Sequence, residues 1–239
     1  MFEQWAGELK TLALEINGID LSEQQVTQFC LYGDLLLEWN KKINLTRIVD
    51  PQEIILKHFL DSLAVSRYLE GSKMADIGTG AGFPGIPLKI VQPGLKLYLV
   101  DSLNKRLDFL REIVLRLGLP EVEIIHKRVE EMARNKQYRA KFDIVTARAL
   151  ARLPVLLEYA VPLLKVKGIF IAMKGSQVED ELAEAKSALL KLGAKAVKVD
   201  KFSLSAGAEH RSIVKIRKIL ATPDEYPRKP GIPTKYPII

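Results

Sequence analysis

Residues 74–90, MADIGTGAGFPGIPLKI, predict a strand that opens through a glycine-rich turn into a helix. The apolar run ends at Asp76 and Ile77 and is followed by four glycines: Gly78, Gly80, Gly82 and Gly85. Glycine lets the backbone turn through conformations that a Cβ forbids, and lets a ligand lie directly against main-chain N–H groups. The last three glycines match G-x-G-x-x-G, and Pro87 falls in the first helical turn, where proline is tolerated.

A second apolar run, 95–100, ends at Asp101, at about the twenty-residue offset where an acid reaches ribose hydroxyls in nucleotide-binding βαβ units. The alternative interpretation is a structural strand-to-helix turn that binds no ligand. Because strand, glycines, helix, strand and acid occur in the expected order, the pattern favours a nucleotide-type cofactor site.

The composition is that of a globular protein with one substantial core and, at most, a small attached subdomain: 239 residues, 48% of them apolar. No run of about eighteen uncharged apolar residues is present, so we expect no membrane span. The N-terminus, MFEQWAGELK, carries acid where a secretory signal carries base, so we expect a cytoplasmic protein. Cys30 is the only cysteine, which excludes an internal disulfide and a Cys-rich metal site.

The net charge of +7 is unevenly distributed. Residues 1–72 contain 6 Lys and Arg against 11 Asp and Glu, whereas the remainder contains 30 against 18 and therefore carries +12. A basic excess in the part that holds the glycine motif indicates a polyanionic partner, usually nucleic acid. Solvated lysines on amphipathic helices would give the same total.

Residues 1–72 are predicted to form a helical subdomain, with helices at 2–16, from a Ser22–Gln25 capping box to about residue 42, and at 52–68. In the link between the second and third of these helices, Asn44 and Thr46 either cap helices or line a substrate entrance. His58 and Asp61 share a helix face; we interpret them as a hydrogen-bonded pair that braces the glycine loop, with a catalytic dyad as the alternative. No metal-ligand cluster is evident, and we expect no metal.

Residues 73–220 alternate strand and helix. Strands are predicted at 73–77, 95–100, 122–126, 142–147 and 168–173. Helices are predicted at 104–117, 154–164 and 178–192. A final pair of antiparallel strands is predicted at 194–204 and 211–219, joined by a loop that contains Gly207. This is an α/β doubly wound, Rossmann-like sheet of five parallel strands plus an antiparallel terminal pair, with one reversed strand at its edge. Five residues fall at strand ends, where such sheets bind ligands: Gly78, Asp101, Glu130, Arg148 and Lys174.

The tail, 221–239, contains five prolines together with Arg228, Lys229 and Lys235. It is predicted to be extended, neither helix nor central strand. It is either an end with no role or a segment that lies along RNA.

Several motifs resemble the bacterial small-subunit ribosomal RNA guanine-N7 methyltransferase family, RsmG or GidB, over residues 15–220. They are DIGTGAGFPGIPL from Asp76, VDSLNKR from Val100, RVEE from Arg128, RAL from Arg148, WNKKINLT from Trp39 and HFLDS from His58. The glycine stretch with its two prolines and following Ile and Leu is much more specific than a bare glycine pattern.

The resemblance implies a class I, S-adenosyl-L-methionine-dependent methyltransferase that modifies a guanine in the 530 loop of 16S rRNA, in naked RNA or in the small ribosomal subunit. It implies that Gly78 and Phe83 contact the cofactor, that Val129 and Glu130 flank its adenine, and that Arg148 lines the pocket. Asp101 would hold the ribose hydroxyls by the general pattern of the class. The complete expected sets are, for the cofactor, Gly78, Gly80, Gly82, Phe83, Asp101, Ser102, Val129, Glu130 and Arg148, and, for RNA, Asn44, Thr46, Arg148, Lys174, Arg228 and Lys229.

Methyl transfer to guanine N7 requires no general base, because N7 carries a lone pair and no proton; we therefore assign no catalytic base. Arg148 and Lys174 are interpreted as partners of phosphate or of the cofactor carboxylate. An NAD-dependent oxidoreductase and a non-catalytic RNA-binding module remain alternatives. We expect a monomer.

Overall fold

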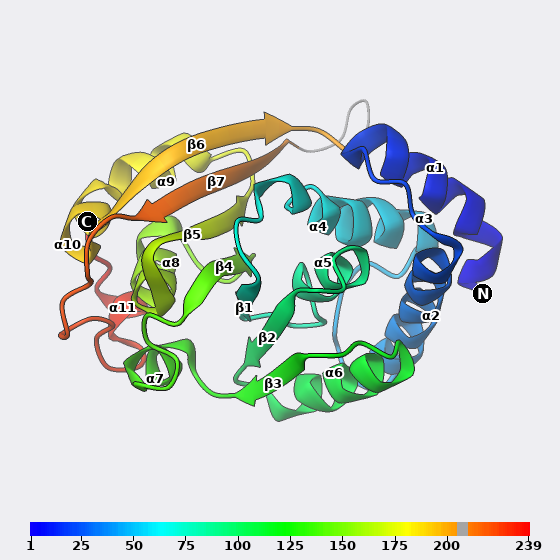
Figure 1. The fold of residues 1–239 in the computed structure, drawn as a ribbon, viewed down its shortest axis with the longest axis horizontal. Coiled ribbons are helices and arrows are strands. Elements are labelled where there is room, and N and C mark those ends of the chain that lie inside the picture. Colours follow the sequence, from blue (N-terminus) through cyan, green and yellow to red (C-terminus); the bar gives the residue numbers. More distant parts are fainter. Residues whose placement is uncertain (205–209) are drawn as a thin grey trace.

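The computed structural model describes residues 1–204 and 210–239, which form one seven-stranded sheet with helices on both faces (Figure 1). The predicted loop around Gly207 lies outside the described residues. The strands are β1 Lys73–Ile77, β2 Lys96–Asp101, β3 Val122–His126, β4 Phe142–Arg148, β5 Leu164–Lys174, β6 Ala194–Phe202 and β7 Arg211–Lys218.

The strand order is β3-β2-β1-β4-β5-β7-β6. Strands β1 to β5 pair in parallel and β7 pairs antiparallel with both β5 and β6, which confirms the predicted fold class. The reversed strand is β7, and it lies between β5 and β6; its predicted place at the edge was wrong. Strand β6 forms at the edge of the sheet, one place away from β5. Strand β7 then runs back and pairs between β5 and β6. The order reverses at β1 and β4, which puts a ligand site between their carboxyl ends.

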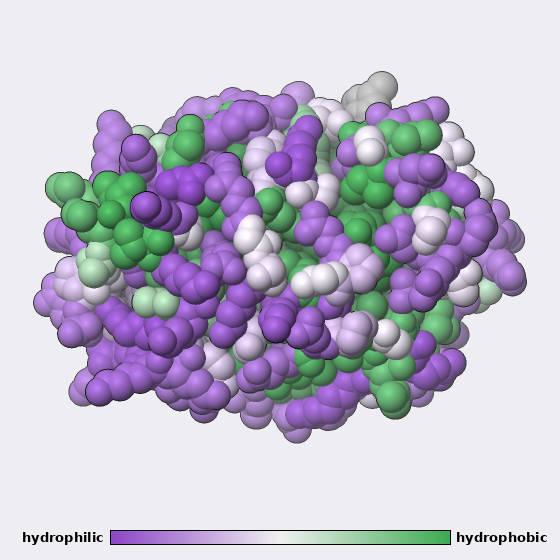
Figure 2. All heavy atoms as spheres, viewed as in Figure 1, coloured by the Kyte–Doolittle hydropathy of each residue, from purple (hydrophilic) through white to green (hydrophobic). Residues whose placement is uncertain are grey.

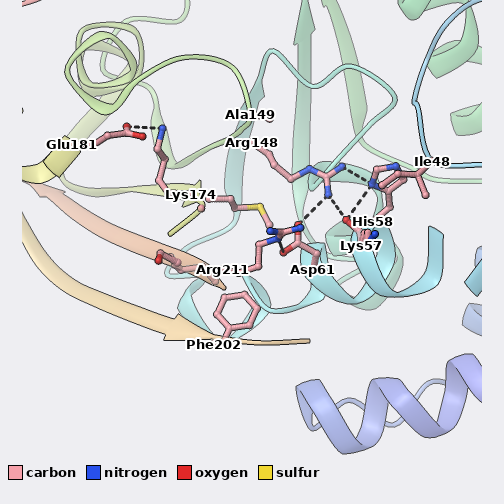
Figure 3. Close-up of a pocket in the computed structure, with 14 residues that line it drawn as sticks. Ile48, Lys57, His58, Asp61, Arg148, Ala149, Lys174, Glu181, Phe202 and Arg211 are labelled. Atoms are coloured by element: carbon pink, nitrogen blue, oxygen red, sulfur yellow. Dashed lines mark hydrogen bonds and ion pairs between the residues drawn. The ribbon is translucent and has the colours of Figure 1, made fainter. Parts of the chain in front are cut away.

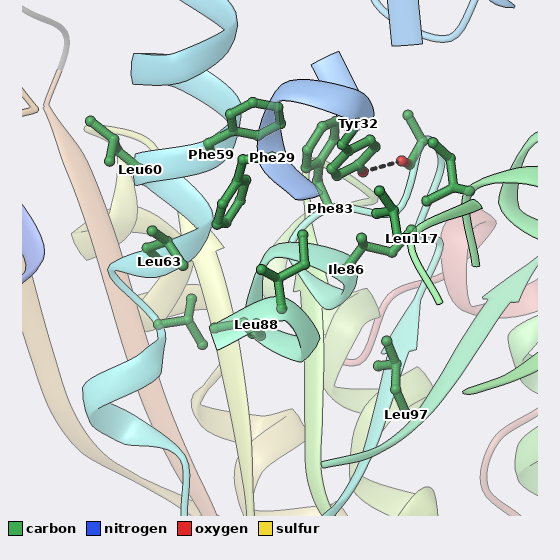
Figure 4. Close-up of a cluster of buried hydrophobic side chains, with 14 of the residues drawn as sticks. Phe29, Tyr32, Phe59, Leu60, Leu63, Phe83, Ile86, Leu88, Leu97 and Leu117 are labelled. Atoms are coloured by element: carbon green, nitrogen blue, oxygen red, sulfur yellow. Dashed lines mark hydrogen bonds between the residues drawn. The ribbon is translucent and has the colours of Figure 1, made fainter. Parts of the chain in front are cut away.

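Two hydrophobic clusters cover the two faces of the sheet. On one face pack η1 Phe2–Trp5, α1 Ala6–Asn17, α2 Glu23–Asn40, α3 Pro51–Ile54, η2 Ile55–Leu60, α4 Asp61–Leu63, η3 Ser66–Tyr68, α5 Gly85–Val91 and α6 Asn104–Arg116. On the other pack α7 Val129–Arg134, α8 Leu153–Ala160, η4 Val161–Leu163, α9 Val178–Glu184, α10 Lys186–Leu192 and α11 Ile232–Lys235. The N-terminal helices share their cluster with the sheet, and Figure 4 shows Phe29 packed on Phe59, whose ring in turn lies near Phe83 of the glycine loop.

The helix predicted at 52–68 is interrupted. It starts with Asp50 as N-cap and Pro51 in the first turn, but residues Ile55–Leu60 form a π-helix and Ser66–Tyr68 a separate 3-10 turn. Such π segments are rare and occur frequently at functional sites. This one carries His58 and ends next to Asp61.

Two other predicted helices also differ from the prediction. The helix predicted at 154–164 stops at Ala160, because Pro162 has no N–H to continue the ladder, and β5 begins at Leu164. The helix predicted at 178–192 is two helices that meet at Ala185. The Ser22–Gln25 capping box is confirmed, with both of its hydrogen bonds present.

The prediction that the tail is extended was wrong. Residues Ile232–Lys235 form the short helix α11, with Pro233 in its first turn, and Ile238 is buried in the second cluster. Proline at the start of a helix breaks no hydrogen bond, since the first N–H groups have no helical partner.

Hydrophilic residues cover most of the face seen in Figure 2, and apolar residues gather at the end where α10 and the C-terminal segment lie. Among the described residues, no helix has the length and apolar character needed to cross a bilayer.

Candidate functional site

The glycine loop follows β1 and turns through three left-handed residues: Gly78, Gly80 and Gly82 have φ of 64°, 60° and 97°. A Cβ on Gly82 would lie 2.5 Å from the end of the Ile86 side chain and 2.9 Å from the Tyr32 hydroxyl, so Gly82 faces the packed side of the loop. A Cβ on Gly80 would have no neighbour within 4 Å. Gly80 therefore faces open space, as the ligand-facing residue of such a loop must.

The buried carboxylate of Asp76 fixes the start of the loop. Its Oδ2 accepts hydrogen bonds from Thr79 Oγ1 at 2.6 Å and from the Gly85 N–H at 3.0 Å, and its Oδ1 accepts from Thr146 Oγ1 at 3.1 Å. Burial raises the pKa of Asp76 to about 6, against the effect of these hydrogen bonds. On the outer side, Tyr32 donates to the carbonyl of Ala81 at 2.5 Å (Figure 4).

A cleft of about 280 Å³ opens between the glycine loop and the ends of β2 and β3. We call it the β1–β2 cleft; its lining residues are Gly78, Asp101, Ser102, Leu103, Arg106, Lys127, Arg128, Val129, Glu130, Leu150 and Tyr159. Five of the residues predicted for the cofactor thus meet here: Gly78, Asp101, Ser102, Val129 and Glu130.

Asp101 connects this cleft to the loop. Its Oδ2 accepts from the Gly80 N–H at 3.0 Å and from Arg106 Nη1 at 3.2 Å, and its Oδ1 accepts from the Leu103 N–H at 2.9 Å. A carboxylate has about four acceptor positions, so it retains capacity for a hydroxyl donor. The Glu130 carboxylate is likewise buried at the cleft wall.

The side chain of Phe83 lies behind the loop, outside the residues that line the β1–β2 cleft. Its ring stacks on His58 with centroids 4.6 Å apart and on Tyr32 at 5.2 Å. The predicted cofactor contact of Phe83 is therefore available only through its main chain. The ring supports the loop from the helical side.

Arg148, at the end of β4, joins that support to a second pocket. Its Nη1 donates to the Lys57 carbonyl at 3.0 Å and to Asp61 Oδ2 at 3.1 Å, and its Nη2 lies 3.1 Å from His58 Nδ1. No direct hydrogen bond joins His58 to Asp61; both reach the glycine loop through Arg148 and Phe83. The predicted pairing of the two was wrong, because the π-helix presents each of them separately to Arg148.

Neither ring nitrogen of His58 is open for proton transfer. Nε2 lies 2.8 Å from Thr46 Oγ1, and Nδ1 accepts from Arg148. Burial, together with the charge of Arg148, lowers the pKa of His58 to about 3, so the imidazole is neutral. Burial raises the pKa of Asp61, while Arg148 and Arg211 oppose that effect.

The second pocket, of about 370 Å³, lies over the ends of β4 and β5 and the start of β7 (Figure 3). We call it the β4–β5 pocket. Its walls include the apolar Ile48, Met173 and Phe202, and the charged Asp61, Arg148, Lys174 and Arg211. Lys174 Nζ is held by Glu181 at 2.7 Å and by the carbonyl of Ala151 at 2.9 Å. The stretch 148–150 contributes to both cavities, which are therefore adjacent.

The other residues predicted for RNA are dispersed. Thr46 accepts from the Ile48 N–H and contacts His58. Its predicted capping of a helix was wrong, because the N-cap of α3 is Asp50. Asn44 is exposed in a groove that shares Ser102 and Arg106 with the β1–β2 cleft. Lys229 is exposed on the tail, whereas the Arg228 guanidinium is bound to Glu158 at 2.6 Å.

Sequence reasoning did not single out several residues that line these cavities or fix the glycine loop. Asp76 was visible at the end of the first strand, but its fixing of the loop depends on Thr146, which is distant in sequence. Arg211 follows the last loop, and Tyr159 lies within an apolar helix. No local pattern marks either residue, because packing alone brings them to the site.

This fold is shared with solved S-adenosylmethionine-dependent methyltransferases. A SAM-dependent methyltransferase from Aquifex aeolicus has the same fold, with a TM-score of 0.54 over 76% of this chain and 98% of that one, at 20% identity. So does the Burkholderia thailandensis 1,6-didemethyltoxoflavin-N1-methyltransferase, solved with S-adenosylhomocysteine, with a TM-score of 0.55 over 84% and 93% of the two chains, at 16% identity.

Residues 25–214 match the GidB family model, rRNA small subunit methyltransferase G. The ribosomal RNA small subunit methyltransferase G of Desulfitobacterium hafniense is 56% identical over 221 residues, 92% of each chain. The protein belongs to this family, and its cofactor is S-adenosyl-L-methionine. The β1–β2 cleft suits that nucleoside, because Gly78 of the glycine loop and two buried carboxylates, Asp101 and Glu130, line its walls.

Proposed function

We propose that the protein methylates N7 of a guanine in the 530 loop of 16S rRNA, guanine 527 in standard numbering. The observation that carries this proposal is the adjacency of the two cavities across residues 148–150. A base in the β4–β5 pocket would lie beside a donor in the β1–β2 cleft. Of the three functions that the sequence left open, family membership favours the methyltransferase.

The cofactor would be held by groups of three kinds. The amides of the loop that contains Gly78, Gly80 and Gly82, with the main chain of Phe83, would lie against it. Asp101 would accept from the ribose hydroxyls, with Ser102 beside it. Val129 and Glu130 would flank the adenine, whose exocyclic amine can donate a hydrogen bond to a buried carboxylate.

The bound cofactor supplies an electrophilic methyl group on a sulfonium. The protein's contribution is alignment, which for well-oriented reactants accounts for about 7–11 kcal/mol of a barrier. Guanine N7 needs no proton removed, which agrees with a His58 that is neutral and engaged at both nitrogens. Positive charge moves onto the purine during transfer, so the negative Asp61 carboxylate in the pocket wall would stabilise that charge.

The RNA would be held by cations around the β4–β5 pocket. Arg211 and Lys174 line it, and Arg148 keeps part of its guanidinium for ligand while it braces the loop. A base in an RNA loop must be splayed out to enter such a pocket, and the apolar Phe202 and Met173 offer a surface for it. Asn44 and Lys229 are exposed and would contact RNA at the periphery. We propose that the enzyme acts as a cytoplasmic monomer on 16S rRNA or the small subunit.

The direct test is mass mapping of 16S rRNA from cells with and without the gene, followed by complementation. We expect one methyl group on a guanine of the 530 loop to disappear and to return on complementation. Unchanged mass at every guanine in that loop would contradict the proposed target. A protein that restores the methyl group when Lys174 and Arg211 are both replaced by alanine would contradict the proposed RNA pocket.

A further inference from the structure

The C-terminal segment 221–239 lies against α7 and α8 (Figure 1). Two arginines hold its backbone carbonyls: Arg139 donates to Thr222, Pro223 and Tyr226, and Arg134 donates to Glu225 and Pro227. The segment is therefore fastened along its length.

A buried ion pair completes the attachment. The side chain of Glu158, in α8, is 1% exposed. It accepts from the main-chain N–H of Arg228 at 2.7 Å, from Nε at 2.9 Å and from Nη2 at 2.6 Å. A buried carboxylate without its partner strongly destabilises a fold. Docking of the tail is thus built into the structure of the domain.

Two contacts from the docked tail reach residues that line the β1–β2 cleft. The Gly231 N–H donates to Glu130 Oε1 at 3.1 Å, and Thr234 Oγ1 lies 3.0 Å from the hydroxyl of Tyr159. Gly231 adopts φ of 84°, the left-handed conformation that favours glycine, and α11 begins immediately after it. The turn at Gly231 therefore sets both contacts from one short segment.

We propose that the tail is a strap that positions Glu130 and Tyr159 at the adenine end of the cofactor site. Gly231 and Thr234 are its positioning residues. The inference rests on the assignment of the β1–β2 cleft to S-adenosylmethionine. It gives the tail a role in cofactor affinity that neither a free end nor an RNA-binding extension would have.

The test is calorimetric binding of S-adenosylhomocysteine and of adenosine to full-length variants. Thr234→Val removes the hydroxyl that contacts Tyr159 and should weaken both ligands about three- to tenfold, the range of one hydrogen bond. Thr234→Ser keeps the hydroxyl and should restore affinity. Thr222→Val is the matched control, because Thr222 Oγ1 donates to the Leu192 carbonyl away from the cleft. It should lower the melting temperature without changing affinity.

Equal affinity of wild type and Thr234→Val would overturn the strap, as would an equal loss in Thr222→Val, which would indicate general destabilisation. Weak binding by Thr234→Ser would overturn it too. Failure of the wild-type protein to bind S-adenosylhomocysteine would instead refute the cofactor site on which the inference rests. Protection of the 128–131 amides from hydrogen exchange should fall in Thr234→Val and not in Thr222→Val; equal protection in both would count against the strap.

Discussion

The guanidinium carbon of Arg148 lies 4.8 Å from the centroid of the Phe83 ring, so the end of β4 is fastened to the glycine loop that follows β1. The same guanidinium pairs with Asp61. One side chain in the wall of the β4–β5 pocket therefore supports the glycine loop and pairs with a buried carboxylate. Its removal should affect both stability and catalysis.

Arg148→Met keeps the approximate side-chain length and removes the charge. We expect the free energy of unfolding to fall by about 3–5 kcal/mol, because Asp61 becomes a buried charge without its closest partner. Arg111→Met is the control: Arg111 pairs with Asp108 in an exposed pair, which contributes about 1 kcal/mol or less. Urea denaturation measures both. A similar loss in the two variants would show that Asp61 is compensated by other groups.

The stability of the protein should depend on His58 between pH 6.5 and about 3. The pKa of His58 is lowered to about 3 in the fold, so across that range the unfolded chain binds a proton that the folded chain does not. Stability therefore falls on acidification, by about 1.4 kcal/mol for each unit by which the pKa of His58 differs between the folded and unfolded chain. His58→Gln should remove that part of the slope. The exposed His126→Gln is the control, and a pH–stability curve unchanged in His58→Gln would contradict the low pKa.

Gly80→Ala should reduce cofactor binding more than stability. Ala at φ of 60° costs about 1–2 kcal/mol, and the Cβ meets no protein atom within 4 Å, so folding should persist. Gly118→Ala is a closely matched control, with φ of 62° and equally open space, at the end of α6. Both should lose similar stability, and only Gly80→Ala should lose S-adenosylhomocysteine affinity, by tenfold or more. Full affinity in Gly80→Ala would place the ligand elsewhere.

Asp101→Ala should weaken cofactor binding by at least tenfold, since it removes the proposed ribose acceptor and the anchor of the Gly80 N–H. RNA affinity should change little, because Asp101 lies outside the β4–β5 pocket. Calorimetry with S-adenosylhomocysteine and filter binding with a 530-loop RNA measure the two. An RNA defect as large as the cofactor defect would contradict this division of the site.

RNA affinity should decrease steeply with added salt, because residues 73–239 carry an excess of 12 positive charges and RNA binding releases counterions. Affinity measured from 50 to 200 mM salt should give a linear log–log plot whose slope becomes shallower in Lys174→Ala. Cofactor affinity, measured over the same range, is the comparison. A flat RNA plot would mean that phosphate contacts contribute little.

The sequence by itself determined the strands, the glycine turn and the acids at strand ends, because these depend on periodicity and on local backbone requirements. Strand bounds at 122–126 and the cleft residues Asp101 and Glu130 followed from that information. Tertiary structure alone decided what each side chain contacts. Arg148 is 87 residues from Asp61, and Gly231 is 101 residues from Glu130. Such pairs form because two distant segments pack against one sheet, and no local pattern records which segments will meet.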